Sequence, residues 1–439
     1  MTQSMHVVRD VRLLPCISYA PAVTAGADDM LSCDLMIRGG TITDILPAGT
    51  APPAAPVMID GKGRILLPLF ADIHTHIDKS FIWDRTPNPD GTFAGALGAV
   101  ERDREAFWTP DDVQARMEFS LQCAWAHGIG ALRTHLDTIG AHGDAVWPLF
   151  RELQARWSSR IALQAVCLVM LERYCDSAAA AAMARTVAET PGGILGAVIM
   201  HDNATSERLD VLFDLAEQYD CDLDLHVDEN GFADTTALEL IADKAISRKS
   251  TRQIVCGHCC SLARQAPGRQ KEIIARVRDA GISIVSLPTC NLYLQDRSAG
   301  TTPFWRGVTL VHELADAGVP VMFASDNVRD PFFPYGDYDL LDVFSRAVRI
   351  AHLDSPIGNW PQAVTTRPAQ LMGRNHILRA GGAADFVMTG ARTMNGVLSR
   401  PSSGRQLVRD GKLITPTLPH YDDLPIGISG ETVRNSLQS

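Results

Sequence analysis

The sequence predicts an α/β protein, a (β/α)8 barrel of the TIM type, with a small β-sandwich domain formed by the N- and C-terminal segments. Three observations predict this class. After Pro68, short apolar segments alternate with helical patterns over about 300 residues, the usual pattern of a barrel with insertions. The first sixty-odd residues and the stretch beyond Ala380 instead contain short strands between glycine turns. The composition is that of a globular chain, with 439 residues of which 46% are hydrophobic and 21% charged.

These composition changes give the expected domain boundaries. We expect a small β-domain from residues 1–67 and 376–415, in which the C-terminal strands pair with the N-terminal ones. Residues 68–375 are expected to form the barrel domain, and residues 416–439 an irregular C-terminal tail.

In the small domain, the segments 33–38 and 41–46 flank Gly39-Gly40, which predicts a β-hairpin. The segment 57–68 predicts another pair of strands around a glycine turn. The barrel strands are expected at eight apolar segments: 65–73, 130–136, 161–169, 194–200, 221–227, 253–257, 282–287 and 319–324. A helix should begin at Thr109-Pro110, with a cap, a proline and two acids in its first turn. Further helices are expected at 177–189, 206–218, 235–246 and 270–280.

Charge and composition exclude several classes of partner. Lys and Arg number 40 against 51 Asp and Glu, a net charge of -11, which argues against binding nucleic acid. No apolar run reaches the roughly 18 residues of a membrane span, and the N-terminal residues lack the apolar core of a secretory signal. The ten cysteines are scattered, which favours free thiols over disulfides. We therefore expect a cytoplasmic protein with a small-molecule substrate and neither nucleic-acid nor membrane partners; a homo-oligomer is compatible with the sequence.

The clearest chemical signal is the motif Asp72-Ile73-His74-Thr75-His76 at the end of the first predicted barrel strand. Residues i and i+2 of a strand face the same way, so both imidazoles can point into the barrel mouth. Two such histidines form half of a site for a first-row metal ion. Two structural histidines are the alternative, which the His and acidic residues at later strand ends disfavour.

Three later strands end in the same kinds of residue: His226-Val227-Asp228-Glu229 follows the fifth, His258 the sixth and Asp326 the eighth. Active-site groups of such barrels come from the carboxyl ends of several strands. His74, His76, His226 and Asp326 thus form a candidate ligand set for one divalent metal, zinc or iron, which would activate a water. Asp326 is expected to take the water proton, Glu229 to carry a proton to the substrate and His258 to hold the developing oxyanion.

These segments resemble the amidohydrolase superfamily, and within it the cytosine deaminase and N-isopropylammelide aminohydrolase-like group. The resemblance covers nearly the whole chain and is carried by the motifs HTHIDK, RTHLD, HVDE, CGHC, LPTCNLYLQDR, SDNVRDPFFPYGD and ADFVM…VRDGK. It implies the same four metal ligands, with Glu229 as the proton shuttle and His258 as the sixth-strand histidine. It also implies hydrolysis of a carbon–nitrogen bond other than a peptide bond.

Three positions depart from the cytosine deaminase pattern. Met170 stands where that group has a glutamine that reads the pyrimidine's amide edge, and methionine cannot make those hydrogen bonds. Asn327 replaces an acid, and Phe332 replaces a tryptophan. Members of the superfamily with two metals bridge them through a lysine on the fourth strand, whereas this chain has no lysine between Lys79 and Lys244. We therefore expect one metal and a substrate other than cytosine.

The sequence leaves other candidates open. Lys79 and Trp83 are interpreted either as cavity-lining residues or as a solvated lysine and a packing tryptophan. For His201, after the fourth strand, contact with the substrate and the absence of a functional role are equally consistent with the sequence. Asp137 is expected to support the site rather than act directly. Asn291 and Gln295 are equally consistent with substrate contact and with holding a loop.

The leading hypothesis is hydrolytic deamination of a nitrogen heterocycle, or loss of a substituted amine from one. Hydrolysis of a cyclic amide by the same metal is the alternative, and ammonia release distinguishes the two. A catalytically inactive metal-binding scaffold is a remote alternative, because the acid, base and ligand set is complete.

Overall fold

The computed structural model describes residues 5–424. The chain forms two compact units. Among the described residues, the first comprises 5–72, 124–131 and 339–418, and the second comprises 73–123, 132–338 and 419–424. The domain boundaries expected from the sequence stay a prediction, and residues 425–439 of the expected tail lie outside the described residues.

The first unit contains a seven-stranded sheet in the order β17-β16-β15-β5-β1-β3-β4. Its strands are β1 (Met5–Leu13), β3 (Leu31–Arg38), β4 (Thr41–Pro47), β5 (Val57–Pro68), β15 (Phe386–Met388), β16 (Gln406–Arg409) and β17 (Lys412–Ile414). β3 and β4 form the predicted hairpin, and Gly39 and Gly40 at its turn have φ of 54° and 78°, which glycine adopts without strain. β15 pairs antiparallel with β5, which confirms the predicted pairing of C- and N-terminal strands.

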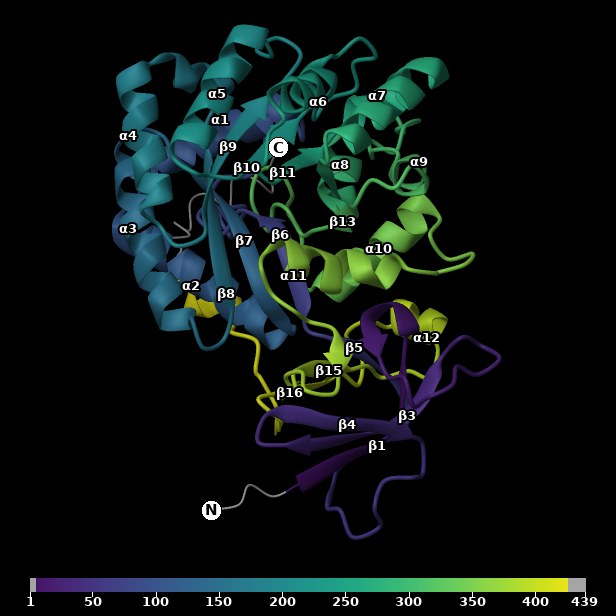
Figure 1. The fold of residues 1–439 in the computed structure, drawn as a ribbon. Coiled ribbons are helices and arrows are strands. Elements are labelled where there is room, and N and C mark those ends of the chain that lie inside the picture. The colour runs from purple at the N-terminus through teal and green to yellow at the C-terminus, as the bar shows by residue number, and fades with distance from the viewer. Residues whose placement is uncertain (1–4, 425–439) are drawn as a thin grey trace. The chain divides into compact units, whose positions relative to one another are not determined.

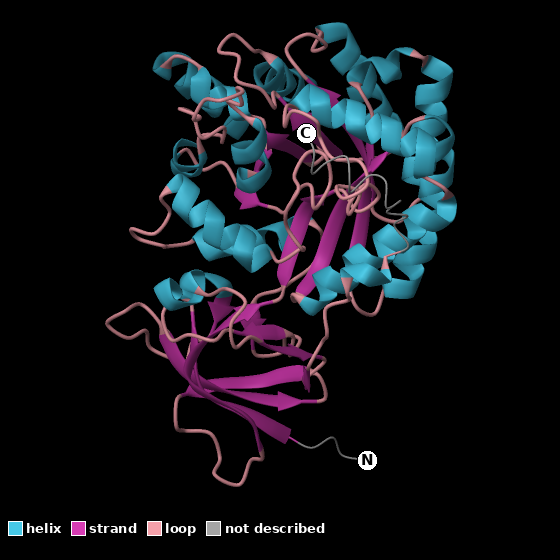
Figure 2. Ribbon diagram, turned by 180° about the vertical axis from the view of Figure 1, so that it is seen from behind, coloured by secondary structure: helices cyan, strands magenta, loops and turns pink. Residues whose placement is uncertain are grey.

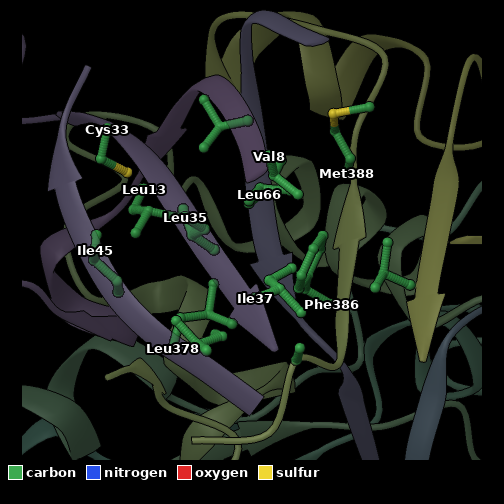
Figure 3. Packing of buried hydrophobic residues seen from close by; sticks show 14 of the residues in the cluster. Val8, Leu13, Cys33, Leu35, Ile37, Ile45, Leu66, Leu378, Phe386 and Met388 are labelled. Carbon is green, nitrogen blue, oxygen red and sulfur yellow. The ribbon is translucent and has the colours of Figure 1, made fainter. Parts of the chain in front are cut away.

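Alternating apolar residues on this sheet form the core of the first unit. Val8, Leu35, Ile37 and Phe386 are fully or almost fully buried in one cluster, where Figure 3 shows their side chains converging. The smaller elements of this unit are β2 (Ser18–Tyr19), which pairs with β14 (Leu378–Arg379), and the helices α10 (Leu340–Ala351), α11 (Thr366–Leu371) and α12 (Met394–Ser399).

The expected pair of strands at 57–68 is wrong, because this segment is the single strand β5. Its glycines form a bulge rather than a reversal. The pairing with β1 shifts between Arg9↔Asp60 and Val11↔Arg64, so two extra residues are accommodated. A Cβ on Gly61 would lie 2.3 Å from Val11 Cγ1, which explains why a residue without a side chain is needed there.

The second sheet is the eight-stranded barrel, confirming the predicted (β/α)8 class, with its strands in chain order (Figure 1). They are β6 (Phe70–Thr75), β7 (Ile129–Asp137), β8 (Ala162–Leu168), β9 (Gly193–Ile199), β10 (Leu223–Val227), β11 (Ile254–His258), β12 (Ser283–Ser286) and β13 (Val321–Phe323). The last strand is joined to the first by a parallel bridge between Thr75 and Asp326. The Asp326 backbone N–H also donates to the His74 carbonyl at 2.9 Å, so the ring of strands is closed beside the candidate ligands.

Seven of these strands match the predicted segments within a few residues. The first differs, because the apolar stretch expected as one strand at 65–73 is divided between β5, which ends at Pro68, and β6, which begins at Phe70. Proline has no backbone N–H to continue a ladder, which is consistent with a change of sheet at this position.

Helices surround the barrel strands (Figure 2). They are α1 (Phe93–Phe107), α2 (Pro110–Ala126), α3 (Gly140–Trp157), α4 (Ser177–Ala188), α5 (Ser206–Gln218), α6 (Ala237–Arg248), α7 (Pro267–Asp279), α8 (Pro288–Leu294) and α9 (Val311–Asp316). α2 begins at the predicted proline, whereas α1 was not predicted because glycines interrupt its sequence. Its N-cap is Thr92, whose hydroxyl accepts from the Gly95 N–H. Between residues 5 and 424, no helix has the length and apolarity needed to cross a membrane.

Candidate active site

The predicted chemical residues gather at the carboxyl ends of the barrel strands. His74 lies on β6, His76 follows the end of that strand two residues later, and His226 lies on β10. His258 and Asp326 have φ of 67° and 62° where β11 ends and after β13. Non-glycine residues rarely adopt this left-handed conformation, and such positions are concentrated at functional sites. Sharp backbone turns therefore direct these side chains.

Four of these side chains form a tight cluster of ligand atoms. The Nε2 atom of His226 lies 3.2 Å from that of His74 and 3.4 Å from that of His76. Asp326 Oδ1 lies 3.2 Å from His76 Nε2 and 3.6 Å from His74 Nε2. Neighbouring ligands bonded at about 2.0–2.1 Å to a tetrahedral ion are about 3.3–3.4 Å apart, so these separations fit a divalent metal.

The protonation of this cluster also suits a metal. Burial, with smaller contributions from neighbouring positive groups, lowers the pKa of His74, His76 and His226 well below the usual histidine value. The imidazoles are therefore neutral at physiological pH, which is the form that binds metals. His135 on β7 packs against the cluster, with its ring centroid 4.0 Å from that of His74.

A second group of side chains lies beside the first. Glu229 Oε1 is 3.2 Å from His258 Nδ1, and donor atoms of Glu229, His258 and Asp326 all lie within 4.8 Å of one another. Asn291, on α8, holds this pair. Its Nδ2 donates to Glu229 Oε1 at 3.2 Å and lies 3.0 Å from His258 Nδ1, while Gln295 Nε2 donates to the Glu229 carbonyl at 3.2 Å.

Burial shifts the titration of both members of this pair. It raises the pKa of Glu229 well above the usual carboxyl range, and the charge of Asp326 adds to the effect while Lys79 opposes it. Burial lowers the pKa of His258 to about 3, against the hydrogen bond from Asn291. Glu229 can thus hold a proton where an ordinary glutamate would not, and His258 is a neutral imidazole.

His76, His226, Glu229 and His258 line a cavity of about 750 Å³, a size typical of sites for drug-sized ligands. Of the five predicted substrate-contact residues, Met170, His201, Asn327 and Phe332 line it. Met170 is 43% exposed, and the His201 ring lies 4.4 Å from that of Phe232 at the same cavity. Trp83 is not part of the lining; its backbone N–H donates to the Arg329 carbonyl.

The cavity is also lined by residues whose roles the sequence left open and by residues that it did not indicate. Lys79 and Asp137 line the wall as a buried ion pair, with 3.1 Å between Lys79 Nζ and Asp137 Oδ1. Phe93, Leu97 and Arg104 of α1 also line it, and no motif marked them because α1 itself was not recognised. The three cysteines near His258 are buried and free. The seven others are also free, which excludes a disulfide among the ten.

Comparisons with known proteins identify the family of the chain. The amidohydrolase family model matches residues 124–414. A pterin deaminase of Rhizobium rhizogenes is 46% identical over 94% of this chain and 94% of its own. The N-isopropylammelide isopropyl amidohydrolase of a Pseudomonas species is 23% identical over 81% of this chain and 87% of its own.

Among solved structures, the 5-methylcytosine deaminase of Klebsiella pneumoniae with phosphonocytosine superposes with a TM-score of 0.79 at 25% identity. It covers 95% of this chain and 99% of the other. Members of the matched family depend on metal ions, and the described residues include a candidate His/Asp site. The chain therefore belongs to the amidohydrolase family and is a hydrolase of carbon–nitrogen bonds, as its motifs predicted.

Proposed function

We propose that this protein is a metal-dependent deaminase that replaces the exocyclic amino group of a bicyclic 2-amino-4-oxo heterocycle, of the pterin type, with oxygen and releases ammonia. The observation that carries the chemistry is the Glu229, His258 and Asp326 group beside the three-histidine cluster. The choice of ring is supported by the pterin deaminase relative, and the cavity has room for two fused rings.

Within this proposal, His74, His76, His226 and Asp326 hold one divalent ion, zinc or iron. Such an ion, when bound, lowers the pKa of water enough to supply a nucleophile near neutral pH. The single ion is supported by the absence of lysine between Lys79 and Lys244, which leaves the fourth strand without the bridging residue of two-metal relatives.

Different residues of the chain carry out the proton transfers. Asp326 accepts the proton of the attacking water. Glu229, whose raised pKa keeps it protonated more readily, gives a proton to the ring nitrogen next to the amino-bearing carbon. It then carries the water proton to the departing amine, so that water and the amino heterocycle become the oxo heterocycle and ammonia. His258 presents its Nε2, which has no partner among the described residues, to the oxygen of the tetrahedral intermediate.

Asn291 sets the direction of His258. Because the Asn291 amide donates toward Nδ1, that nitrogen acts as an acceptor, and the single proton of the neutral ring lies on Nε2. This tautomer donates a hydrogen bond to an oxyanion. Asn291 is thus a positioning residue for both Glu229 and His258.

The remaining expectations belong to the same proposal. Ten free cysteines are consistent with a cytoplasmic location, and a net charge of -11 disfavours nucleic acid as a partner. A homo-oligomer is compatible with the free cysteines and with the net charge.

A panel of substrates tests the function. Purified, metal-loaded protein is incubated with pterin, cytosine, an N-alkylamino triazine and a cyclic amide, and ammonia and product masses are measured. Ammonia and the oxo product from pterin support the proposal. Release of an alkylamine from the triazine, or opening of the amide ring without ammonia, would instead identify one of the alternative hydrolase activities. If none of these compounds is turned over, the result would favour the remaining alternative, a catalytically inactive metal-binding scaffold.

A further inference from the structure

The cavity contains a charged pair that the proton path does not use. Lys79 is 5% exposed and Asp137 is 6% exposed, and both line the cavity. Their ion pair spans 3.1 Å, and Arg104 Nη1 lies 3.4 Å from the other Asp137 oxygen. A buried ion pair loses much of its Coulombic gain to desolvation, so it contributes little to stability by itself. Stability therefore does not explain why these two charged side chains are buried together.

Both members have hydrogen-bonding capacity to spare. The Lys79 ammonium carries three protons, and among the described residues it donates one hydrogen bond, to Asp137. The Asp137 carboxylate offers about four acceptor positions and accepts hydrogen bonds from Lys79 and Arg104. Burial alone would lower the pKa of Lys79, but the charges of Asp137, Asp78 and Asp330 outweigh it and raise that pKa. Lys79 is thus a dependable cationic donor next to an acceptor.

The pair lies across the barrel from Glu229. Lys79 follows β6 and Asp137 ends β7, the first two strands of the closed ring of eight. Glu229 follows β10, the fifth strand, and in a ring of eight the fifth strand lies opposite the first. All three side chains line one cavity, so a flat ring bound between them would have Glu229 at one edge and the ion pair at the other.

A 2-amino-4-oxo heterocycle has two matching edges. On one side of the amino-bearing carbon C2 is the bare ring nitrogen N1, and on the other side are N3–H and the carbonyl O4. We propose that Asp137 accepts a hydrogen bond from N3–H while Lys79 donates one to O4, so that the pair reads the lactam edge. Glu229 is then left facing N1, the nitrogen that it protonates. This assignment rests on the proposed function and fills the role that Met170 cannot perform.

A substrate read in this way must have a free lactam edge. In 2,4-diaminopteridine the edge is inverted, since N3 becomes an acceptor and the 4-amino group a donor. Lys79 would then face a donor and Asp137 an acceptor. Sites built to hydrogen-bond a substrate group reject analogues that leave it unmatched by about 10⁴–10⁵-fold. We expect the intact protein to prefer pterin over 2,4-diaminopteridine by at least about 10³-fold in kcat/KM.

Two variants test the residues themselves. Lys79→Met and Asp137→Asn preserve side-chain size and remove, respectively, the donor and the acceptor charge. Each should lower kcat/KM for pterin by about 10²-fold or more and reduce the pterin preference to about tenfold or less, with metal content unchanged. Lys244→Met is the matched control, because it breaks another Lys–Asp pair, 2.7 Å from Asp210, between α6 and α5. It should leave the preference unchanged.

The outcomes separate this inference from the proposed function. If the intact protein releases ammonia from neither pteridine, the proposed function fails. If it deaminates both equally well, or if the two variants lose activity on both in equal proportion, the lactam-reading role is overturned while deamination stands. Should both variants fail to fold, 3-methylpterin, which lacks N3–H, provides the test in the intact protein. Turnover of this analogue equal to that of pterin would overturn the role.

Discussion

Replacing Glu229 by glutamine should remove turnover while preserving the fold. The side chain is 6% exposed and is not one of the four candidate ligands, so the substitution changes the proton path and little else. Glutamine has the same shape, and its amide oxygen can accept the Asn291 hydrogen bond that now ends on Glu229 Oε1 at 3.2 Å. The packing and the position of Asn291 should therefore persist.

The size of the effect follows from what the amide cannot do. It neither donates a proton to the ring nitrogen nor carries one to the leaving amine. General acid–base groups contribute about 10²–10⁴-fold, so kcat should fall by that factor, equivalent to about 2.7–5.4 kcal/mol in the barrier. Steady-state ammonia release measures kcat and KM, and metal analysis and thermal unfolding should match the unmodified protein.

Glu207→Gln, an exposed position in the first turn of α5, is the matched control and should retain full activity. If Glu229→Gln kept most of its kcat, Glu229 would not be in the proton path. If it lost its metal, Glu229 would be a ligand rather than a shuttle.

Three further outcomes are expected. Metal analysis of protein purified without chelators should find about one equivalent of divalent metal per chain, and two full equivalents would contradict the single-ion site. Cytosine should be a poor substrate, because Met170 offers no hydrogen bonds to its amide edge; a kcat/KM for cytosine at or above about 10⁵ M⁻¹s⁻¹ would show that reasoning to be wrong. Leu35→Ala, in the fully buried core of the first unit, should cost about 2–5 kcal/mol of unfolding free energy without changing kcat. Chemical denaturation measures the loss of stability, and assays of the folded variant show whether kcat has changed.

The barrel could be predicted because its strands are short apolar runs at a regular spacing. Residues such as Leu225 and Val227 are fully buried in β10, and this burial is visible as local apolarity in the sequence. His74 and His76 could be predicted to share a face because the two-residue period of a strand is a local property. Where the sequence failed was at a change of sheet, at Pro68, where one apolar stretch belongs to two strands.

The walls of the cavity were less predictable, because they depend on distant segments. Lys79 and Asp137 are 58 residues apart, and only the arrangement of the first two strands brings Nζ within 3.1 Å of the carboxylate. α1 has glycines at 95 and 98 and weak periodicity, so neither its existence nor its Arg104 was evident. Asn291 stood in a recognisable motif, but its contacts with Glu229 and His258 require the closed barrel.

The central claim is that the His/Asp cluster holds one metal ion and uses it to deaminate a pterin-type ring. The most direct measurement is ammonia release from pterin by chelator-stripped protein, titrated with zinc or iron. Activity should be absent before metal is added, rise linearly and reach its maximum at about one equivalent per chain. Full activity in the stripped protein, or no ammonia from pterin after saturation with either metal, would contradict the account.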